Sequence, residues 1–377
     1  MAPARPSNRT ANAALALGSV VLTLLAVESG LRLASGRPLE PPAPRHADTG
    51  LELLDSPYPA SFDAELGHVP TPGASGRANV WGTRVTITAE GMRSNGHRAG
   101  EGVPIIAVGD SFTFGDEVND DETWPAQLEG LVGRPVVNAG VFGYGLDQIV
   151  LRAESLLEST PSDLMIVALI GDSVARCEYA YRYAWKPYFE LDGRGLRLRN
   201  VPVPEPTART PASSAVARWM RGSHLLYFVG SRLDPDRWLT PDSIRVHDDG
   251  PEVAVRLIER LSEQARRRGI QLVWVLLWHP GADNQPALPA IRRAQQLGDA
   301  VIALGAGLRE QMPVLESGQG RDPSHLFHIL PSGRSGHLSA AGNAEVARML
   351  AEPLVEHGLL VAAPPPSQPG SGRGPVE

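Results

Sequence analysis

A short apolar segment that ends at a glycine constrains the fold of this chain most. The segment Ile105 to Val108 is mostly β-branched and runs directly into Gly109-Asp110-Ser111-Phe112. A short apolar run followed by such a turn predicts a buried strand that leads into a helix. Open α/β folds bind their ligands at the carboxyl edge of a parallel sheet, so we expect Ser111 at that edge. The N–H groups of the following helix would point at an anion beside this serine.

Strands and helices alternate along most of the chain. Predicted strands cover 84–88, 105–108, 135–138, 163–170, 271–278 and 300–304, and predicted helices cover 124–131, 147–158, 251–268, 286–297 and 340–356. This alternation predicts a three-layer α/β/α domain with a mostly parallel sheet over residues 84–358. Residues 174–250 break the rhythm, so we expect them to form an insertion that contains a hairpin at 190–199 and a short helix near 213–230.

The insertion contains a cluster of aromatic residues. Its members are Tyr179, Tyr181, Tyr183, Trp185, Tyr188 and Phe189. Such rings can stack on sugars, or they can pack the insertion against the core of the domain. We favour packing, because a dense group of aromatic side chains usually buries most of its surface.

The N-terminal part contains one long apolar run. Residues 1–12 are polar, residues 13–27 carry no charge, and the run extends to residue 33. It approaches the ~20 residues that a membrane-spanning helix needs. Three interpretations compete: an uncleaved anchor, a signal peptide cleaved near residues 34–36, and a buried helix. We expect a cytoplasmic leader at 1–12, a single-pass membrane anchor at 13–33, and a domain outside the cytoplasm.

Composition excludes several classes of protein. The net charge of -7 and the pI near 5.8 argue against a nucleic-acid-binding protein. The single cysteine, Cys177, excludes an intrachain disulfide and a thiolate metal cluster. No metal site or cofactor is predicted. Proline and glycine are frequent in residues 34–80, which we expect to be a linker, and in residues 363–377, which we expect to be a disordered tail.

Four segments resemble the motif blocks of the SGNH hydrolases, the GDSL-type esterases and lipases. They are residues 109–112, 138–143, 171–173 and 336–342, and the resemblance spans about residues 84 to 356. The single N-terminal helix is similar to that of membrane-anchored members of this family. The resemblance implies an SGNH or flavodoxin-like fold and an enzyme that acts on ester bonds.

The resemblance also implies a role for each matched residue. It makes Ser111 the nucleophile and His337 the base, because a serine hydroxyl needs a neutral imidazole to accept its proton. It gives Gly143 an N–H group in the oxyanion hole. It places Asp172 where the family has an asparagine, and a carboxyl group donates there only while it is protonated. Asp110 of the first block is grouped with these oxyanion and substrate-binding positions.

The chain departs from the family at the acid of the triad. The family's aspartate lies two or three residues before its histidine, where this chain has Ser335 and Arg334. Upstream, Asp322 and His325 form an Asp-x-x-His motif. Asp322 could be the acid for His337, the motif could supply the whole dyad, or it could be a surface turn, since Asp-Pro-Ser is ordinary turn composition. We expect His337 beside the nucleophile and His325 farther away.

Two functions are compatible with these patterns. The first is an esterase or acyl transferase that acts on a small acyl ester, such as an O-acetyl group of an envelope carbohydrate. The second is a membrane-anchored, catalytically degenerate SGNH-like module that binds a glycan or a protein. A dinucleotide-binding domain is excluded, because residues 109–115 lack the G-x-G-x-x-G phosphate turn.

Overall fold

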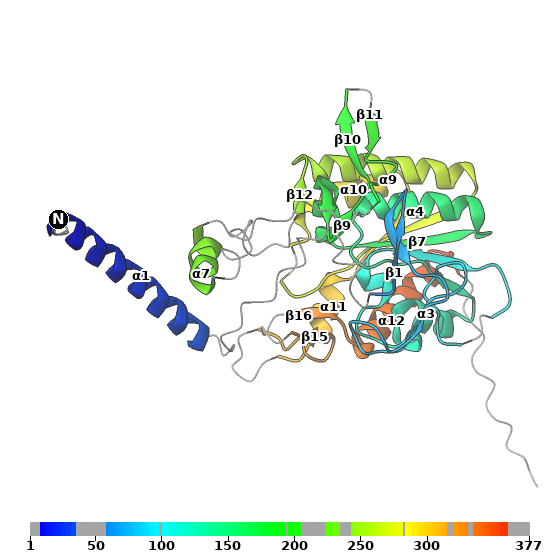
Figure 1. Cartoon of the computed structure of the whole chain (residues 1–377). Helices are drawn as coiled ribbons and strands as arrows, with labels where there is room; N and C mark the ends of the chain where they lie inside the picture. Colours follow the sequence, from blue (N-terminus) through cyan, green and yellow to red (C-terminus); the bar gives the residue numbers. More distant parts are fainter. Residues whose placement is uncertain are drawn as a thin grey trace, which may run out of the picture. The chain divides into compact units, whose positions relative to one another are not determined.

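The structure, a computed structural model, describes residues 8–34, 58–97, 100–193, 195–205, 223–233, 243–281, 283–314, 320–330 and 335–360 (Figure 1). The chain divides into two compact units. One comprises Met1–Glu52 and Pro206–Ser243, and the other comprises Leu53–Glu205 and Ile244–Glu377. The tail predicted at 363–377 and residues 1–7 and 35–57 lie outside the described residues.

Five parallel strands form the central sheet of the larger unit (Figure 1). They are β5 (Ile105–Val108), β6 (Val136–Asn138), β7 (Leu164–Leu169), β13 (Gln271–Leu276) and β14 (Ala300–Ala303). Their order across the sheet is β14-β13-β7-β5-β6, and each strand is parallel to its neighbours. The predicted mostly parallel sheet is therefore confirmed, and the polar turns that follow β5, β6, β7 and β13 share one edge.

Helices cover both faces of this sheet. One face packs against α4 (Leu146–Ser159), α9 (Gly250–Arg267) and α10 (Leu288–Gln296), and the other against α3 (Trp124–Val132), α11 (Gly305–Gln311) and α12 (Ala340–Glu356). Successive strand residues point to opposite faces. Ile106 and Val108 accordingly belong to the first core, while Ile105 and Ala107 belong to the second. The three layers agree with the predicted α/β/α architecture.

The described part of the predicted linker has regular structure. Strands β1 (Ala60–Asp63) and β2 (Gly67–Pro70) pair antiparallel, and β3 (Ser75–Gly76) pairs with β4 (Val85–Thr86). The rings of Tyr58 and His68 pack against Phe142, with centroid distances of 5.4 and 5.7 Å. The structure differs from the prediction here because these strands are stabilised by rings from a distant segment, which the local proline and glycine content does not reveal.

The described part of the predicted insertion consists of short strands. They are β8 (Tyr179–Arg182), β9 (Ala184–Trp185), β10 (Tyr188–Asp192), β11 (Gly195–Arg199) and β12 (Ser243–Arg245). The hairpin expected at 190–199 corresponds to β10 and β11, which pair antiparallel. Phe189 is fully buried, and Tyr181 packs edge-on against Trp185 with centroids 5.4 Å apart. These contacts agree with the packing interpretation of the aromatic cluster.

The smaller unit contains two described helices, α1 (Asn8–Ala34) and α7 (His224–Leu233). The segment Leu15–Leu33 has a mean hydropathy of 1.5, none of it is buried, and it is long enough to cross a membrane. It has the length and composition of a membrane anchor or a signal sequence, whereas a buried core helix would be covered. The carboxylate of Glu28 accepts hydrogen bonds from the backbone N–H groups of His224 and Leu225, at 2.9 and 2.8 Å. Glu28 therefore caps the first turn of α7.

Candidate active site

Ser111 is the first residue of a short helix, α2 (Ser111–Phe114), which directly follows β5. Asp110 caps this helix, because its Oδ1 accepts a hydrogen bond from the N–H of Phe112 at 3.0 Å. Gly115 ends the helix in the left-handed conformation, with φ of 85°. The turn thereby places Ser111 at the carboxyl edge of the sheet, as the pattern of the first motif predicts.

The structure brings His337 to this serine. His337 lies on β16 (Ser335–Leu338), which pairs with β15 (Phe327–Ile329) and leads into α12. Its Nε2 lies 2.9 Å from Ser111 Oγ. His325 is exposed, and its backbone oxygen accepts a hydrogen bond from the Ser339 hydroxyl at 2.7 Å. Of the two candidate histidines, His337 is the one placed to take a proton from Ser111.

Two neighbouring carboxyl groups face the ring of His337. Glu117 Oε1 lies 3.5 Å from Nδ1, and Asp116 Oδ2 lies 3.7 Å from Nε2. Neither residue was expected from the sequence. The signal available for them was an acidic pair directly after Gly115, the glycine that ends the nucleophile's helix.

Asp322 does not occupy the predicted position beside His337. Its Oδ1 instead accepts a hydrogen bond from the N–H of Ser324 at 2.9 Å, and this bond lowers the pKa of Asp322. In the part of the chain that the structure describes, the carboxylates within 4.0 Å of the His337 nitrogens are those of Asp116 and Glu117. The structure therefore favours the surface-turn interpretation of Asp-Pro-Ser-His, because the carboxylate is used within its own turn.

The acidic surroundings control the protonation of His337. Burial opposes the charged imidazole, but Asp116 and Glu117 outweigh burial and raise the pKa of His337. Burial raises the pKa of Asp116 to about 7. The contact with His337 lowers the pKa of Glu117. The imidazole consequently becomes a free base at a higher pH than an isolated histidine does.

The loop after β6 lies directly against α2. A Cβ atom at Gly140 would stand 2.3 Å from the backbone nitrogen of Phe114, so only glycine permits this approach. Gly143 has φ of 76°, in the region that favours glycine. Within the described residues, the backbone N–H groups of Ser111 and Gly143 have no hydrogen-bond partner. Both are available as donors to an oxygen that gains negative charge.

His68 on β2 holds the peptide that carries the Gly143 N–H. Its Nε2 donates a hydrogen bond to the carbonyl oxygen of Phe142 at 2.9 Å. Burial lowers the pKa of His68 to about 4, so the ring is neutral, and this contact assigns the proton to Nε2. In a trans peptide the N–H points away from the C=O, so His68 fixes the direction of the Gly143 N–H. Sequence reasoning missed His68 because it lies inside the segment expected to be a linker.

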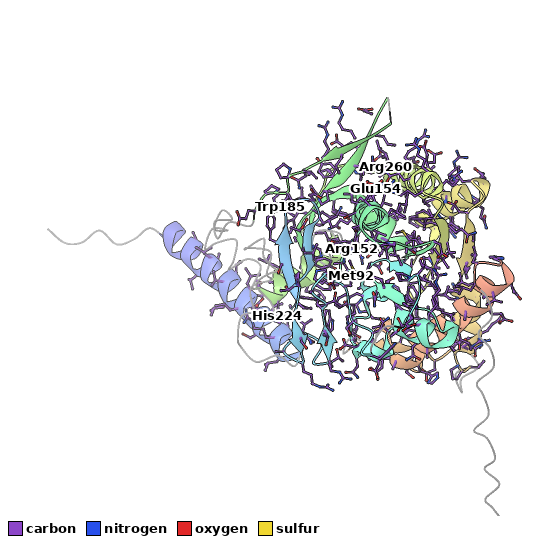
Figure 2. The ribbon with its side chains drawn as sticks, turned by 90° about the vertical axis from the view of Figure 1, so that its right-hand side faces the viewer. Met92, Arg152, Glu154, Trp185, His224 and Arg260 are labelled. Atoms are coloured by element: carbon purple, nitrogen blue, oxygen red, sulfur yellow. The ribbon has the colours of Figure 1, made fainter. Side chains whose placement is uncertain are left out.

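Arg152 of α4 fixes the start of the same loop. Its Nε donates to the carbonyl oxygen of Ala139 at 2.8 Å, and its Nη2 donates to that of Gly91 at 3.0 Å. The same guanidinium lies 3.3 Å from the sulfur of Met92, a pair that Figure 2 labels. The loop that carries Gly143 is thus held at both ends by buried side chains.

Asp172 is not a hydrogen-bond donor in this structure. Asp172 lies in α5 (Gly171–Ala175), and Arg176 directly follows this helix. The Oδ2 of Asp172 lies 2.6 Å from Arg176 Nη2 and 3.2 Å from Arg182 Nη2 on β8. Burial opposes the charge, but the two guanidinium groups outweigh it and lower the pKa of Asp172. An ionised carboxylate has no proton to offer an oxyanion, so Asp172 does not replace the family's asparagine in that role.

Asp110 supports the nucleophile turn and does not face a ligand. It is fully buried. Besides the N–H of Phe112, it accepts a hydrogen bond from the Ser173 hydroxyl at 2.8 Å and lies 3.6 Å from Arg176 Nη1. These partners occupy both carboxylate oxygens, so the predicted substrate-binding role of Asp110 does not agree with the structure.

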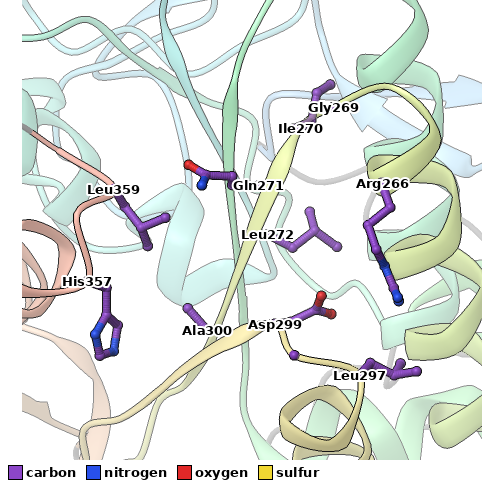
Figure 3. Close-up of a pocket in the computed structure, with 11 residues that line it drawn as sticks. Arg266, Gly269, Ile270, Gln271, Leu272, Leu297, Asp299, Ala300, His357 and Leu359 are labelled. Carbon is purple, nitrogen blue, oxygen red and sulfur yellow. The ribbon is translucent and has the colours of Figure 1, made fainter.

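A separate pocket of about 620 Å³ lies at the opposite edge of the sheet (Figure 3). It is lined by residues at the start of β13 and β14, among them Gln271, Asp299 and Ala300, and by His357. The Asp299 carboxylate accepts a hydrogen bond from Trp274 Nε1 at 3.1 Å, so it is engaged in packing. Among the described residues, no group of three or more His, Cys, Asp or Glu side chains is arranged to hold a metal ion.

A scan against protein-family models and a search of curated proteins found no match to this chain. Solved structures do resemble it. A lipolytic protein of the G-D-S-L family from Desulfitobacterium hafniense is 15% identical, with a TM-score of 0.37 over 67% of this chain and 99% of that one. A lipase/acylhydrolase from Enterococcus faecalis is 12% identical, with a TM-score of 0.36 over 70% and 100%. A catalytic mutant of an acetylxylan esterase from Geobacillus stearothermophilus is also 12% identical, with a TM-score of 0.36 over 70% and 97%. These similarities are distant, so the chemistry of the site rests on its own geometry.

Proposed function

We propose that this chain is an SGNH-type serine hydrolase, an esterase or acyl transferase that acts on a small acyl ester. The observation that carries the proposal is the 2.9 Å distance between Ser111 Oγ and His337 Nε2 at the carboxyl edge of a parallel sheet. A serine hydroxyl becomes a useful nucleophile when an imidazole stands at hydrogen-bond distance to accept its proton.

The reaction proceeds in two stages. In the first, Ser111 Oγ attacks the acyl carbon while His337 Nε2 takes the hydroxyl proton, and the N–H groups of Ser111 and Gly143 donate to the oxygen that gains charge. The ester bond then breaks, and the imidazolium gives its proton to the leaving alcohol. In the second stage, water or an acceptor hydroxyl attacks the acyl-serine while His337 Nε2 takes its proton. The bond between the acyl carbon and Ser111 Oγ then breaks, and the imidazolium returns the proton to Oγ.

The proposed enzyme lacks the side-chain donor that the family has in its oxyanion hole. Losing one such donor costs about 2.7–4 kcal/mol of transition-state stabilisation. Two backbone donors remain in this site, so we expect a slow enzyme with a turnover about 10²–10³ below that of a site with all three donors.

We propose an O-acetyl group on an envelope carbohydrate as the substrate. The support is the described part of the insertion beside the site. Tyr179 and Tyr183 lie against the guanidinium of Arg182, with 5.8 and 5.5 Å to the ring centroids, and Arg182 contacts Asp172. Both rings are half-buried, so each has an apolar face within a polar surface, a combination that suits a sugar ring.

We propose that α1 is an uncleaved anchor and that the domain lies outside the cytoplasm. The uncovered apolar segment Leu15–Leu33 supports the anchor, and the proline-rich segment at 37–44 behind it supports a domain held away from the membrane. An anchored enzyme outside the cytoplasm would meet acylated envelope carbohydrate close to the membrane.

A fluorophosphonate probe, which forms a covalent bond with activated serines, tests the proposed function. We expect the purified full-length protein to gain one probe mass on Ser111 and to hydrolyse 4-nitrophenyl acetate. Ser111→Ala and His337→Gln should lose both properties, and the control Ser75→Ala, on the exposed strand β3, should keep them. A folded wild-type protein that stays unlabelled would instead support the non-catalytic module that binds a glycan or a protein.

A further inference from the structure

We infer that Glu117 is the positioning acid of His337, and that this acid has moved from the strand before the histidine to the loop behind the nucleophile. The inference rests on the proposed function and deepens it. It gives the Ser111–His337 pair a third member that neither the motif blocks nor the resemblance to the family contains.

The contacts of Glu117 place its charge on the correct side of the ring. Its Oε1 lies 3.5 Å from His337 Nδ1, and its Oε2 lies 3.9 Å from Nδ1 of His328 on the paired strand β15. Nε2 of His337 must be free of its proton to serve Ser111, so the neutral ring carries its proton on Nδ1. A carboxylate at Nδ1 favours that tautomer and stabilises the imidazolium that forms during the reaction.

The backbone at Glu117 adds an independent observation. Its φ is 71°, in the left-handed region that residues other than glycine, asparagine and aspartate rarely occupy. Among the described residues, only Tyr183 and Asn200 share this property without being glycine. Strained backbone is retained where a function requires the side chain. Here the strained residue is the one whose carboxylate reaches the base.

The position that the acid has left is visible on β16. Ser335 lies two residues before His337 on this strand, so the two side chains point to the same face. A serine there cannot carry the charge. A Cβ atom at the intervening Gly336 would point to the other face and stand 3.5 Å from Glu117 Oε2, so the carboxylate of Glu117 lies beside the backbone of β16 while its Oε1 reaches the His337 ring. A charge from another segment thus takes the place of the one that position 335 lacks.

Asp116 has a different relation to the ring. It faces Nε2 at 3.7 Å, the side that serves Ser111, so it does not favour the tautomer with its proton on Nδ1. Four other ionisable groups surround the imidazole: Asp110 and Glu117 near the nucleophile, His328 on β15, and His279 after β13. Any titration of His337 reports on all five groups, so the test below compares variants that differ in a single charge.

Four variants of the full-length protein test the inference. Glu117→Gln keeps the shape and removes the charge, Glu117→Gly removes the charge and relaxes the backbone, and Glu117→Gly combined with Ser335→Asp returns a carboxylate to β16. Asp121→Asn is the matched control, because it removes an exposed charge four residues away, in the short 3-10 helix Asp120–Glu122. The measurements are kcat/KM against pH, the rate of probe labelling, the melting temperature, and the NMR titration of the His337 ring.

A different result is expected for each variant. Glu117→Gln should lower kcat/KM by about 10³-fold and move the His337 titration to lower pH, while Asp121→Asn changes neither. Glu117→Gly should melt at a higher temperature than wild type yet be as inactive as Glu117→Gln. The kcat/KM of the double variant should be at least tenfold higher than that of Glu117→Gly alone.

Two outcomes would overturn the inference. One is Glu117→Gln with kcat/KM within threefold of an active wild type. The other is a His337 titration that Glu117→Gln moves no more than Asp121→Asn does. If the wild type neither labels nor turns over, the proposed function fails. The NMR titration then still decides whether Glu117 acts on His337, because it needs no turnover.

Discussion

The side-chain oxygen of Asn343 accepts a hydrogen bond from the backbone N–H of Trp124 at 2.9 Å, across 219 positions of the chain. The amide nitrogen of Asn343 donates to the carbonyl oxygens of Leu338 and Ser339 at 3.3 and 3.0 Å. One buried amide therefore ties the start of α3 to the end of the strand that carries His337. This contact fixes the end of β16, next to His337.

Replacing Asn343 with leucine should destabilise the fold and misplace the base. The change leaves the N–H of Trp124 without its acceptor and removes the side-chain donor to the carbonyl oxygens of Leu338 and Ser339, of which Ser339 keeps its bond from the backbone N–H of residue 343. An unsatisfied buried group costs about 1–3 kcal/mol. We expect the free energy of unfolding in urea to fall by at least 2 kcal/mol, within the upper part of this range. The control Arg267→Ala, at an exposed ion pair, should change it by less than about 0.5 kcal/mol. Equal stability of the two variants would contradict this role.

Esterase activity should rise with pH through a pKa above that of free histidine. The base works only when neutral, and Asp116 and Glu117 raise the pKa of His337 against the effect of burial. Asp116→Asn removes one of these charges, so the acidic limb of the kcat/KM profile should move to lower pH. The midpoint of this limb is an apparent pKa of the coupled pair of Asp116 and His337, not of either residue alone. A limb that stays in place in Asp116→Asn would show that Asp116 does not act on the base.

The same group predicts how stability depends on pH. Because the folded pKa of His337 is raised, its contribution to stability is fully present below the unfolded value of about 6.5. This contribution should be lost as the pH rises through the folded pKa. His337→Gln should therefore be less stable than wild type at pH 6, and the difference should shrink at pH 9. Urea unfolding at the two values measures it, and a difference that grows with pH would contradict the sign.

Replacing His68 with phenylalanine should slow turnover without weakening substrate binding. The change keeps the ring packing on Phe142 but removes the hydrogen bond that holds the Phe142–Gly143 peptide. Losing an oxyanion donor outright costs about 10²–10³ in kcat, so a loosened donor should cost about 10–100-fold. His97→Phe is the control, since His97 pairs with Glu129. A changed KM with an unchanged kcat would show that His68 does not act through the oxyanion.

Asp172→Asn should destabilise the fold at neutral pH, and this effect on stability should disappear in acid. Burial opposes its charge, but Arg176 and Arg182 lower the pKa of Asp172, so its contribution is present above the unfolded value of about 3.9. It is lost as the pH falls through the folded pKa. Because the carboxylate is partly exposed, we expect only about 1 kcal/mol at pH 7. Unfolding measured at pH 7 and pH 3 tests this, and an effect larger at pH 3 would refute it.

The topology can be tested with a reporter fused to the C-terminus. Alkaline phosphatase folds only outside the cytoplasm, so a fusion to the full chain should be active and should sediment with membranes. Deleting residues 13–33 should abolish both properties. An inactive fusion, or a soluble fragment that lacks the N-terminal segment, would contradict an uncleaved anchor.

The sequence by itself determined the layered architecture and the place of Ser111. Ile105 to Val108 is a short apolar run that stops at a glycine, and both signals are local, because burial sets the composition of a strand and a turn needs particular backbone angles. The same holds for His337, which stands just before a capped helix whose first turn includes Gly342. Once the strands are known to be parallel, their polar ends must share an edge.

Only the tertiary structure decided which charges surround that site. Glu117 and His68 act through contacts of a few ångströms with segments that are far apart in the chain, whereas Asp172 meets Arg176 and Arg182 only because the turn after α5 brings their side chains together. Asp322 carries a motif that suits an acid, yet its carboxylate is used by its own turn. The physical reason is that Coulomb and hydrogen-bond energies depend on distance and burial, and spacing along the chain specifies neither.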